Sequence, residues 1–423
     1  MQSDLRGQSE LRANWRLLLA ATLGSSFGMP TLAYFSIGVF APIMAEEFGW
    51  SFASIMGGLF LTAVVILLCG PIIGAIVDRY GARRVIAVSL VGLSFGYTSL
   101  SISSGSIYLY YASWAWMAVT GIGATAISFT HAVNSAFVVR RGIALGITLA
   151  GSGIFAMWVK PFAHWAIEHF GWRATIVIIG ALPLLIGVPV VLWGLRSRGE
   201  SVPTSYRVAS AVAPATGLTV KAALRKPAFW LLLLAFVPIS FANGAPLPNM
   251  ENILRTLRLS PGEIVELTSL IGVSLVVGRI AGGWLVDRIW APLVGSIMLT
   301  AAALGCWLLA QASVTHREAL AAVMFLSVAA GVEYDLLAYL IARYMGMRSY
   351  GTLYSIAFGL FAIGAGAGPS VLGHAFDASA TYAQGLLICG GLLIFSALVL
   401  LTLGRYPRFG DAPVVEVRVG PIP

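Results

Sequence analysis

The segment CGPIIGAIVDRYGARRVIAV, from Cys69 to Val88, puts four charged residues into seven positions of an otherwise very apolar chain. The charges fall between two apolar stretches, so they mark the end of one hydrophobic helix, a short turn and the start of the next. A second segment, GRIAGGWLVDRIWAPLVGSI, from Gly278 to Ile297, repeats the pattern with fewer charges. A charged turn that recurs between apolar helices indicates a duplicated helical architecture.

Composition predicts a protein embedded in lipid. Of the 423 residues, 58% are hydrophobic and 10% are charged, and the mean hydropathy is +0.88. A soluble domain carries about 25% charged residues, so this chain lacks the polar side chains that a water-exposed surface needs. The net charge of +9 then indicates basic loops on one face of a lipid bilayer, and no nucleic-acid partner is expected.

The sequence contains no recognisable enzyme site. Its three cysteines all lie in apolar runs, and the glycine run at 364–368 lacks the lysine and the preceding strand of a phosphate-binding loop. The polar N-terminal stretch has no pattern of a cleaved signal peptide. We therefore predict no catalytic residue, no metal and no cofactor.

Breaks in the apolar pattern predict an all-α membrane protein with twelve transmembrane helices, since each span needs about 20 apolar residues. The predicted spans are 15–43, 53–77, 85–104, 107–135, 142–167, 172–195, 228–250, 262–286, 291–313, 318–343, 350–374 and 381–404. Around the longest hydrophilic interruption, the sequence predicts a tail at 1–14, a six-helix bundle at 15–195, a linker at 196–227, a second six-helix bundle at 228–404 and a tail at 405–423.

Basic residues set the predicted orientation. If both termini lie on one side, 20 of the 26 Lys and Arg residues fall on that side, four fall on the other, and Lys160 and Arg279 lie inside spans. Because basic loops stay in the cytoplasm, we expect a monomeric, multi-pass protein of the cell inner membrane with both termini cytoplasmic.

A single shift relates the two halves. The triplet Gly74, Asp78 and Arg79 falls on a second triplet, Gly283, Asp287 and Arg288, after 209 positions (283 − 74), and the same shift carries Gly142 onto Gly351. Two duplicated halves joined by a linker are typical of transporters that work by alternating access.

Specific motifs carry a family resemblance. The stretch GAIVDRYGARR at 74–84 resembles the loop 2–3 signature of the major facilitator superfamily. Three further stretches, EEFGWSFASI, EHFGWRAT and RKPAFWLLLLA, resemble the monocarboxylate and oxalate–formate exchanger branch. The resemblance implies two pseudo-symmetric six-helix bundles, the major facilitator fold, that move a solute between them.

The charged turn predicts a gate between the halves. Gly74 permits close helix packing, and Gly81 suits a tight turn. Asp78 either caps the N-terminus of a neighbouring helix or pairs with a nearby arginine. Membrane anchoring alone explains the arginines but not the aspartate or its copy. The predicted gating residues are Gly74, Asp78, Arg79, Gly81, Arg83, Asp287 and Arg288.

Arg279 is the leading candidate for substrate binding, because an ionisable residue inside a span is costly and usually functional. The matching position in the first half is Gly70, so the scaffold does not require an arginine there. A guanidinium grips a carboxylate with two parallel hydrogen bonds, and the resemblance implies this role for an arginine in span 8. The alternative is an internal salt bridge to Glu333 or Asp335.

Those two carboxylates are candidates for proton coupling. Two residues apart on a helix, Glu333 and Asp335 point about 200° apart, so they do not share a face. A carboxylate near Arg279 can change protonation as substrate comes and goes, and Glu333 is the favoured choice because it lies nearer mid-span. A static ion pair is the alternative.

Four further residues are candidates. Lys160, in the outer half of span 5, either attracts anions or snorkels outward. Asn243 and Tyr34 lie in glycine- and proline-broken spans and are candidate donors to substrate, with simple packing as the alternative for Tyr34. His131 either shuttles protons or only hydrogen-bonds. The resemblance also implies a lysine in span 11, where this chain has Ala357, so a doubly charged substrate such as oxalate is not favoured unless Lys160 takes the place of that lysine.

The sequence thus predicts a secondary transporter for a small organic anion, a monocarboxylate or an aromatic acid, by proton symport or by exchange with a counter-anion. Two alternatives stay open. One is proton-coupled efflux of a drug-like or neutral metabolite, and the other is a receptor or scaffold of transporter shape.

Overall fold

The computed structural model describes residues 10–50, 52–195, 217–257, 259–379, 381–407 and 409. The first half contains α2 (Trp15–Ser26), α3 (Met29–Phe48), α4 (Phe52–Tyr80), α5 (Ala82–Thr98), η1 (Ser99–Ile102), α6 (Ile107–Gly121), η2 (Ile122–Ala124), α7 (Ala126–Ala136), α8 (Arg141–Leu182), η3 (Pro183–Gly187) and α9 (Val188–Gly194). The second half contains α10 (Val220–Ala223), α11 (Pro227–Gly244), α12 (Pro246–Thr256), α13 (Pro261–Val286), α14 (Ala291–Leu309), α15 (His316–Met345), α16 (Tyr350–Ser379) and α17 (Ala383–Leu401). Residues 196–216 of the predicted linker, and most of both tails, lie outside the described residues.

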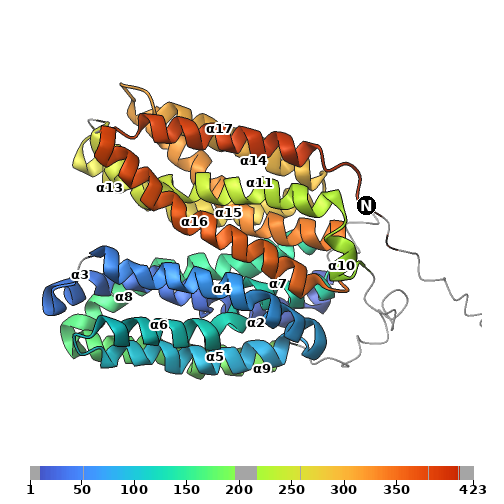
Figure 1. Ribbon diagram of the computed structural model, residues 1–423, viewed down its shortest axis with the longest axis horizontal. Coiled ribbons are helices and arrows are strands. Elements are labelled where there is room, and N and C mark those ends of the chain that lie inside the picture. Colours follow the sequence, from blue (N-terminus) through green and yellow to red (C-terminus); the bar gives the residue numbers. More distant parts are fainter. Residues whose placement is uncertain are drawn as a thin grey trace, which may run out of the picture.

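The helices form two bundles (Figure 1). The first bundle, α2–α9 in blue to green, occupies one layer, and the second bundle, α10–α17 in yellow-green to red, occupies the other. Helices suit a chain in lipid because each one satisfies its own backbone hydrogen bonds. The predicted all-α fold with two helical bundles is confirmed.

The duplication is visible in the helix boundaries. Helices in the two halves start 209 residues apart (261 − 52), in the pairs Phe52 and Pro261, Ala82 and Ala291, Ile107 and His316, and Arg141 and Tyr350. One shift therefore relates four helices of the first half, α4, α5, α6 and α8, to α13, α14, α15 and α16. Equivalent residues of the two halves can be compared directly on this basis.

Eleven helices of the described residues are long and apolar enough to cross a membrane. The predicted span 107–135 is not among them, because α6 and α7 are separated by η2 and by Thr125, whose backbone is extended (φ −113°, ψ 177°). Neither piece alone is long enough to span. A multi-pass membrane protein is confirmed, and the count of twelve stays a prediction.

Breaks in two predicted spans of the first bundle lie against each other. The first span is interrupted at Gly28, between α2 and α3, and a Cβ on Gly28 would lie 2.7 Å from the carbonyl oxygen of Ala124, at the end of η2. Discontinuous helices of this kind typically surround transporter binding sites. In span 7, by contrast, α11 ends at Gly244 and α12 begins at Pro246, but Ala245 between them keeps helical backbone angles (φ −69°, ψ −49°).

The Phe-Gly-Trp motif occurs at 48–50 and again at 170–172, and its two copies connect α3 to α8. Gly49 and Gly171 both have positive φ, 69° and 77°, a conformation that favours glycine. Glu47 accepts hydrogen bonds of 2.7 Å from the Trp172 indole and of 2.7 Å from Arg173. The motifs therefore tie the end of α3 to the second part of α8, within one bundle.

Candidate functional site

Asp78, at the end of α4, caps a helix of the opposite bundle. The backbone N–H of Gly351 donates to its Oδ1 (2.8 Å), and the N–H of Thr352 donates to its Oδ2 (3.2 Å). Both donors belong to the first turn of α16, where unpaired N–H groups and the helix dipole favour a negative charge. Of the arrangements that the sequence left open, the structure thus shows the helix cap.

Asp287 makes the equivalent contact in the other direction. Its Oδ1 accepts from the N–H of Gly142 (2.6 Å) and its Oδ2 from the N–H of Ile143 (3.0 Å), both at the start of α8. Burial raises the pKa of Asp287 although the two backbone hydrogen bonds oppose this shift. Asp287 therefore contributes to the cap mainly through its two hydrogen-bond acceptor oxygens rather than through its charge. We call the two caps the inner latches, because they lie on the side predicted to be cytoplasmic.

Four glycines bring the bundles into backbone contact at the inner latches. Gly74 packs on Gly351, and Gly283 packs on Gly142; a Cβ added to any of the four would lie less than 3.0 Å from the partner's carbonyl oxygen. Small residues permit such close helix approach in membranes. With both caps formed and both glycine pairs in contact, the two bundles meet tightly on this side.

The remaining predicted gate residues lie next to these contacts. Gly81 begins α5 with φ 85°, which fits the predicted turn. The guanidinium of Arg79 lies 5.4 Å from the ring of Tyr80, that of Arg288 lies 3.9 Å from the ring of Trp284, and Arg83 donates a hydrogen bond to the carbonyl of Leu192.

His131 lies at an inner latch. Its Nε2 is 3.5 Å from Oδ1 of Asp78, and its ring is 6.0 Å from the ring of Tyr350. The Tyr350 hydroxyl donates across the bundle interface to Oγ1 of Thr130 (2.9 Å). The structure therefore places His131 beside Asp78, and the choice between a proton shuttle and simple hydrogen bonding stays a prediction.

Glu10 makes a contact next to the Asp287 latch that the sequence reasoning missed. Its carboxylate accepts backbone hydrogen bonds from Val138 (2.7 Å), Val139 (3.1 Å) and Arg140 (2.9 Å), in the turn that leads into α8. This turn precedes the helix start that Asp287 caps. No sequence motif marks the contact, because it joins residues about 130 positions apart.

We expect Asp287→Asn to weaken the closed arrangement. Both oxygens of Asp287 accept a hydrogen bond, and asparagine offers only one acceptor, so one buried N–H loses its partner. Such a loss costs about 1–3 kcal/mol, which lowers the ratio of closed to open forms roughly 5- to 150-fold. Labelling of a thiol at Ser355, which is buried between α16 and α4, measures the change.

The reporter is Ser355→Cys in a background with alanine at Cys69, Cys306 and Cys389. Glu251→Gln, at an exposed salt bridge to Arg255, serves as the control. Its thiol at position 355 should be labelled as slowly as in the reporter protein that keeps Asp287. Equal labelling rates in the Asp287→Asn and control proteins would show that this cap does not hold the bundles together.

Arg279 is buried in the second bundle and paired with a carboxylate. Its side chain is 7% exposed, and Nη1 donates to Oδ1 of Asp335 (3.3 Å) across α13 and α15. The guanidinium also lies 5.8 Å from the ring of Tyr334. The pair is held by one hydrogen bond, since Nε of Arg279 and Oδ2 of Asp335 bind no partner among the described residues.

The two carboxylates of α15 have different partners. Glu333 is buried and accepts a hydrogen bond from Nδ2 of Asn243 (3.3 Å), on α11. Tyr34, on α3 of the first bundle, interacts electrostatically with Glu333, yet its side chain is 54% exposed. Asn243 and Tyr34 thus both lie near Glu333.

The Arg279–Asp335 pair faces the first bundle. A Cβ on Gly146, in α8, would lie against the backbone carbonyl of Arg279 and 3.6 Å from Oδ2 of Asp335. The pair therefore lies at the contact between α13, α15 and α8. Lys160 also belongs to α8, but its side chain lies outside the part of the chain that the structure describes.

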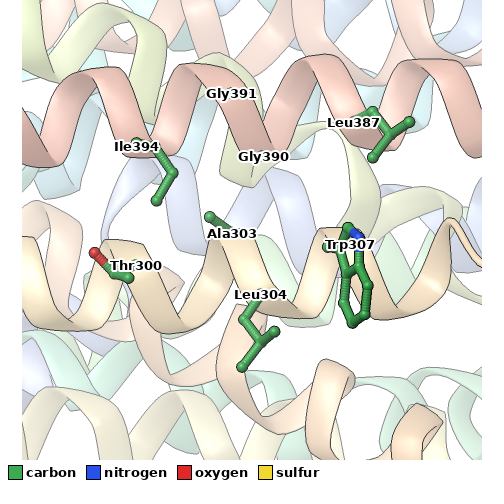
Figure 2. Close-up of a pocket in the computed structure, with 8 residues that line it drawn as sticks. All are labelled: Thr300, Ala303, Leu304, Trp307, Leu387, Gly390, Gly391 and Ile394. Atoms are coloured by element: carbon green, nitrogen blue, oxygen red, sulfur yellow. The ribbon is translucent and has the colours of Figure 1, made fainter.

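A pocket of about 340 Å³ lies elsewhere, between α14 and α17 (Figure 2). Thr300, Ala303, Leu304, Trp307, Leu387, Gly390, Gly391 and Ile394 line it. Several of these apolar side chains are half exposed, Trp307 at 51%, so the pocket opens outward toward lipid. None of the predicted site residues lines it.

The sequence profile of the Major Facilitator Superfamily matches residues 23–369. The chain belongs to the major facilitator superfamily. Human monocarboxylate transporter 11 is 24% identical over 92% of this chain and 83% of its own length. Rat monocarboxylate transporter 13 is 25% identical, over 93% of this chain and 89% of its own length. The predicted superfamily is confirmed. The two relatives are named monocarboxylate transporters, which agrees with the predicted branch, and they are transporters, not enzymes.

Solved structures confirm the fold. The fucose:proton symporter of E. coli superposes with a TM-score of 0.68 at 16% identity, over 92% of this chain and 99% of the symporter. The human organic anion transporter MFSD10 superposes with a TM-score of 0.66 at 17% identity, with the same coverage. This superfamily member therefore has the major facilitator fold.

Proposed function

We propose that this protein is a secondary transporter that carries a small monocarboxylate or aromatic acid across the cell inner membrane by alternating access. The observation that carries the proposal is the buried, singly bonded Arg279, which faces the opposite bundle. An intramembrane guanidinium with unused donors suits a carboxylate. The curated relatives, which are named monocarboxylate transporters, support the substrate class.

The ion pair suggests how transport is coupled. Asp335 occupies one donor of Arg279, so an anion has to compete with it. Proton binding to Asp335 removes that charge and releases the guanidinium for the substrate carboxylate. A proton and an anion then enter the site together, which is symport. Exchange of one bound anion for another on Arg279, with Asp335 displaced throughout, is the other mode.

The inner latches suggest how access alternates. With Asp78 and Asp287 capping α16 and α8, the site is closed toward the predicted cytoplasmic side. Opening to that side breaks both caps and separates the glycine pairs. Because the two caps are related by the internal repeat, one rocking motion of the bundles releases both.

Uptake by the purified protein in proteoliposomes tests the proposal, with radiolabelled pyruvate and benzoate as probes. An inside-alkaline pH gradient should drive accumulation if protons are co-transported, and counterflow against preloaded unlabelled acid should report exchange. Extrusion of a cationic dye without uptake of either acid would favour the efflux hypothesis and overturn this one.

Asp335→Asn is expected to separate the two modes. Asparagine binds no proton and leaves Arg279 continuously available, so gradient-driven accumulation should fall at least about tenfold while counterflow persists. The matched control is Glu333→Gln, which neutralises the other buried carboxylate of α15, two positions before Asp335. If Glu333→Gln abolishes accumulation and Asp335→Asn does not, Glu333 carries the proton instead.

A further inference from the structure

Three buried polar atoms without hydrogen-bond partners among the described residues belong to neighbouring side chains. They are Nε of Arg279, Oδ2 of Asp335 and the hydroxyl of Tyr354. The Tyr354 side chain is fully buried (0% exposed) and interacts electrostatically with both of the others. Burying a hydroxyl without a partner is unfavourable, so three such groups together indicate a place that a polar ligand completes.

Aromatic stacking holds Tyr354 in one orientation. Its ring stacks on Tyr350 (5.5 Å between centroids, 7° between planes) and on Phe358 (5.7 Å, 18°) along α16. Phe358 in turn contacts Tyr334 (5.8 Å), the ring that lies 5.8 Å from the Arg279 guanidinium. A continuous set of rings therefore connects Tyr354 to the predicted anion site.

Tyr354 lies on the inner side of the ion pair. It is four residues into α16, about 6 Å from the helix start, whereas Asp335 is ten residues, about 15 Å, from the inner end of α15. One turn nearer the inner end, the hydroxyl of Tyr350 is occupied by Thr130. In depth, Tyr354 thus lies between the ion pair and the latch, on the inner side of the site.

The internal repeat shows that the scaffold does not need these groups. At the shift of 209 positions (283 − 74), Tyr354 corresponds to Leu145, Asp335 to Ala126 and Arg279 to Gly70. Leu145 is as fully buried as Tyr354. The same fold position therefore accepts an apolar side chain, and the polar cluster belongs to the second bundle alone.

We propose that Tyr354 is a further substrate-binding residue, whose hydroxyl donates a hydrogen bond to the carboxylate held by Arg279. The inference rests on the proposed transport of monocarboxylates and adds a second donor to it. Arg279 holds the anion from α13 and Tyr354 holds it from the inner side, on α16. Two donors on two helices favour a planar carboxylate over a neutral amide of the same shape.

Tyr354→Phe tests the proposal, because phenylalanine keeps the stacked ring and removes only the hydroxyl. We expect the KM for pyruvate and for benzoate to rise about tenfold or more, with an unchanged maximal rate and unchanged thermal unfolding. The matched control is Tyr110→Phe in the first bundle, since Tyr110 is equally buried but donates to the carbonyl of Ile55; its KM should stay at the wild-type value.

The outcomes separate this inference from the proposed function. If the wild-type protein takes up neither acid, both fail. Suppose instead that the wild-type protein transports both acids and that Arg279→Lys loses transport. If Tyr354→Phe then keeps the wild-type KM, only the role of Tyr354 is overturned. Should Tyr354→Phe not fold, Tyr354→Leu, which introduces the residue found at position 145, carries the same expected rise in KM, without the expectation of unchanged thermal unfolding.

Discussion

Arg279→Lys is expected to raise the KM for monocarboxylates about 100-fold or more. Lysine keeps the positive charge and can still face Asp335, but its compact ammonium cannot form the two parallel hydrogen bonds of a guanidinium with a carboxylate. Hydrogen bonds to charged groups contribute about 1.5–3 kcal/mol each, so losing the paired geometry has a large effect. Initial rates of radiolabelled pyruvate uptake in proteoliposomes measure it.

A matched substitution and a double variant make the test specific. Arg255→Lys changes an exposed arginine that pairs with Glu251 and should leave the KM unchanged. Arg279→Gln leaves Asp335 buried without its partner, which destabilises the fold by about 3–5 kcal/mol. Adding Asp335→Asn should restore thermal stability without restoring transport. Wild-type affinity in Arg279→Lys would remove Arg279 from the site.

Gly283→Ala is expected to reduce transport at least about tenfold and to leave the inner side open. The added methyl group would meet the backbone of Gly142 and Ile143, and a backbone cannot move aside as a flexible side chain does. Forcing a methyl group into a packed contact costs about 1–3 kcal/mol, which shifts the ratio of closed to open forms roughly 5- to 150-fold.

Thiol labelling at Ser355→Cys reports the opening in this variant, as it does for Asp287→Asn. Gly391→Ala is the control, because a Cβ at Gly391 has no neighbour within 4 Å and the position lies on the outward-facing pocket of α17. The control should transport and label as wild type does. Normal transport by Gly283→Ala would show that the close approach of α13 and α8 is not needed for the cycle.

Most of the fold was predictable from the sequence because lipid imposes one rule on the whole chain. Apolar stretches of about 20 residues have to be helices there, and the repeat relating Asp78 to Asp287 showed that the halves are copies. The exception is span 107–135, which is broken at Thr125. Hydropathy does not report such a break, because η2 and its neighbours are as apolar as a continuous helix.

The sequence identified the charged residues of the site more readily than it identified which of them pair. Periodicity placed Glu333 and Asp335 on different faces, and the structure gives them different partners. Sequence reasoning favoured Glu333 for proton coupling and left the partner of Arg279 open between Glu333 and Asp335, and the observed ion pair is with Asp335. It also passed over Tyr354, because a tyrosine in an apolar span looks like packing until its hydroxyl is seen to be unpartnered.

The composition and the spacing of charges were by themselves enough to predict a duplicated helical membrane protein with a charged turn in each half. Both properties follow from local rules, the cost of polar groups in lipid and the geometry of single helices. Only the tertiary structure decided that each aspartate caps the other bundle's helix and that Arg279 meets Asp335. These contacts join residues 56 to 273 positions apart, and such pairings depend on how whole bundles dock, which no local pattern records.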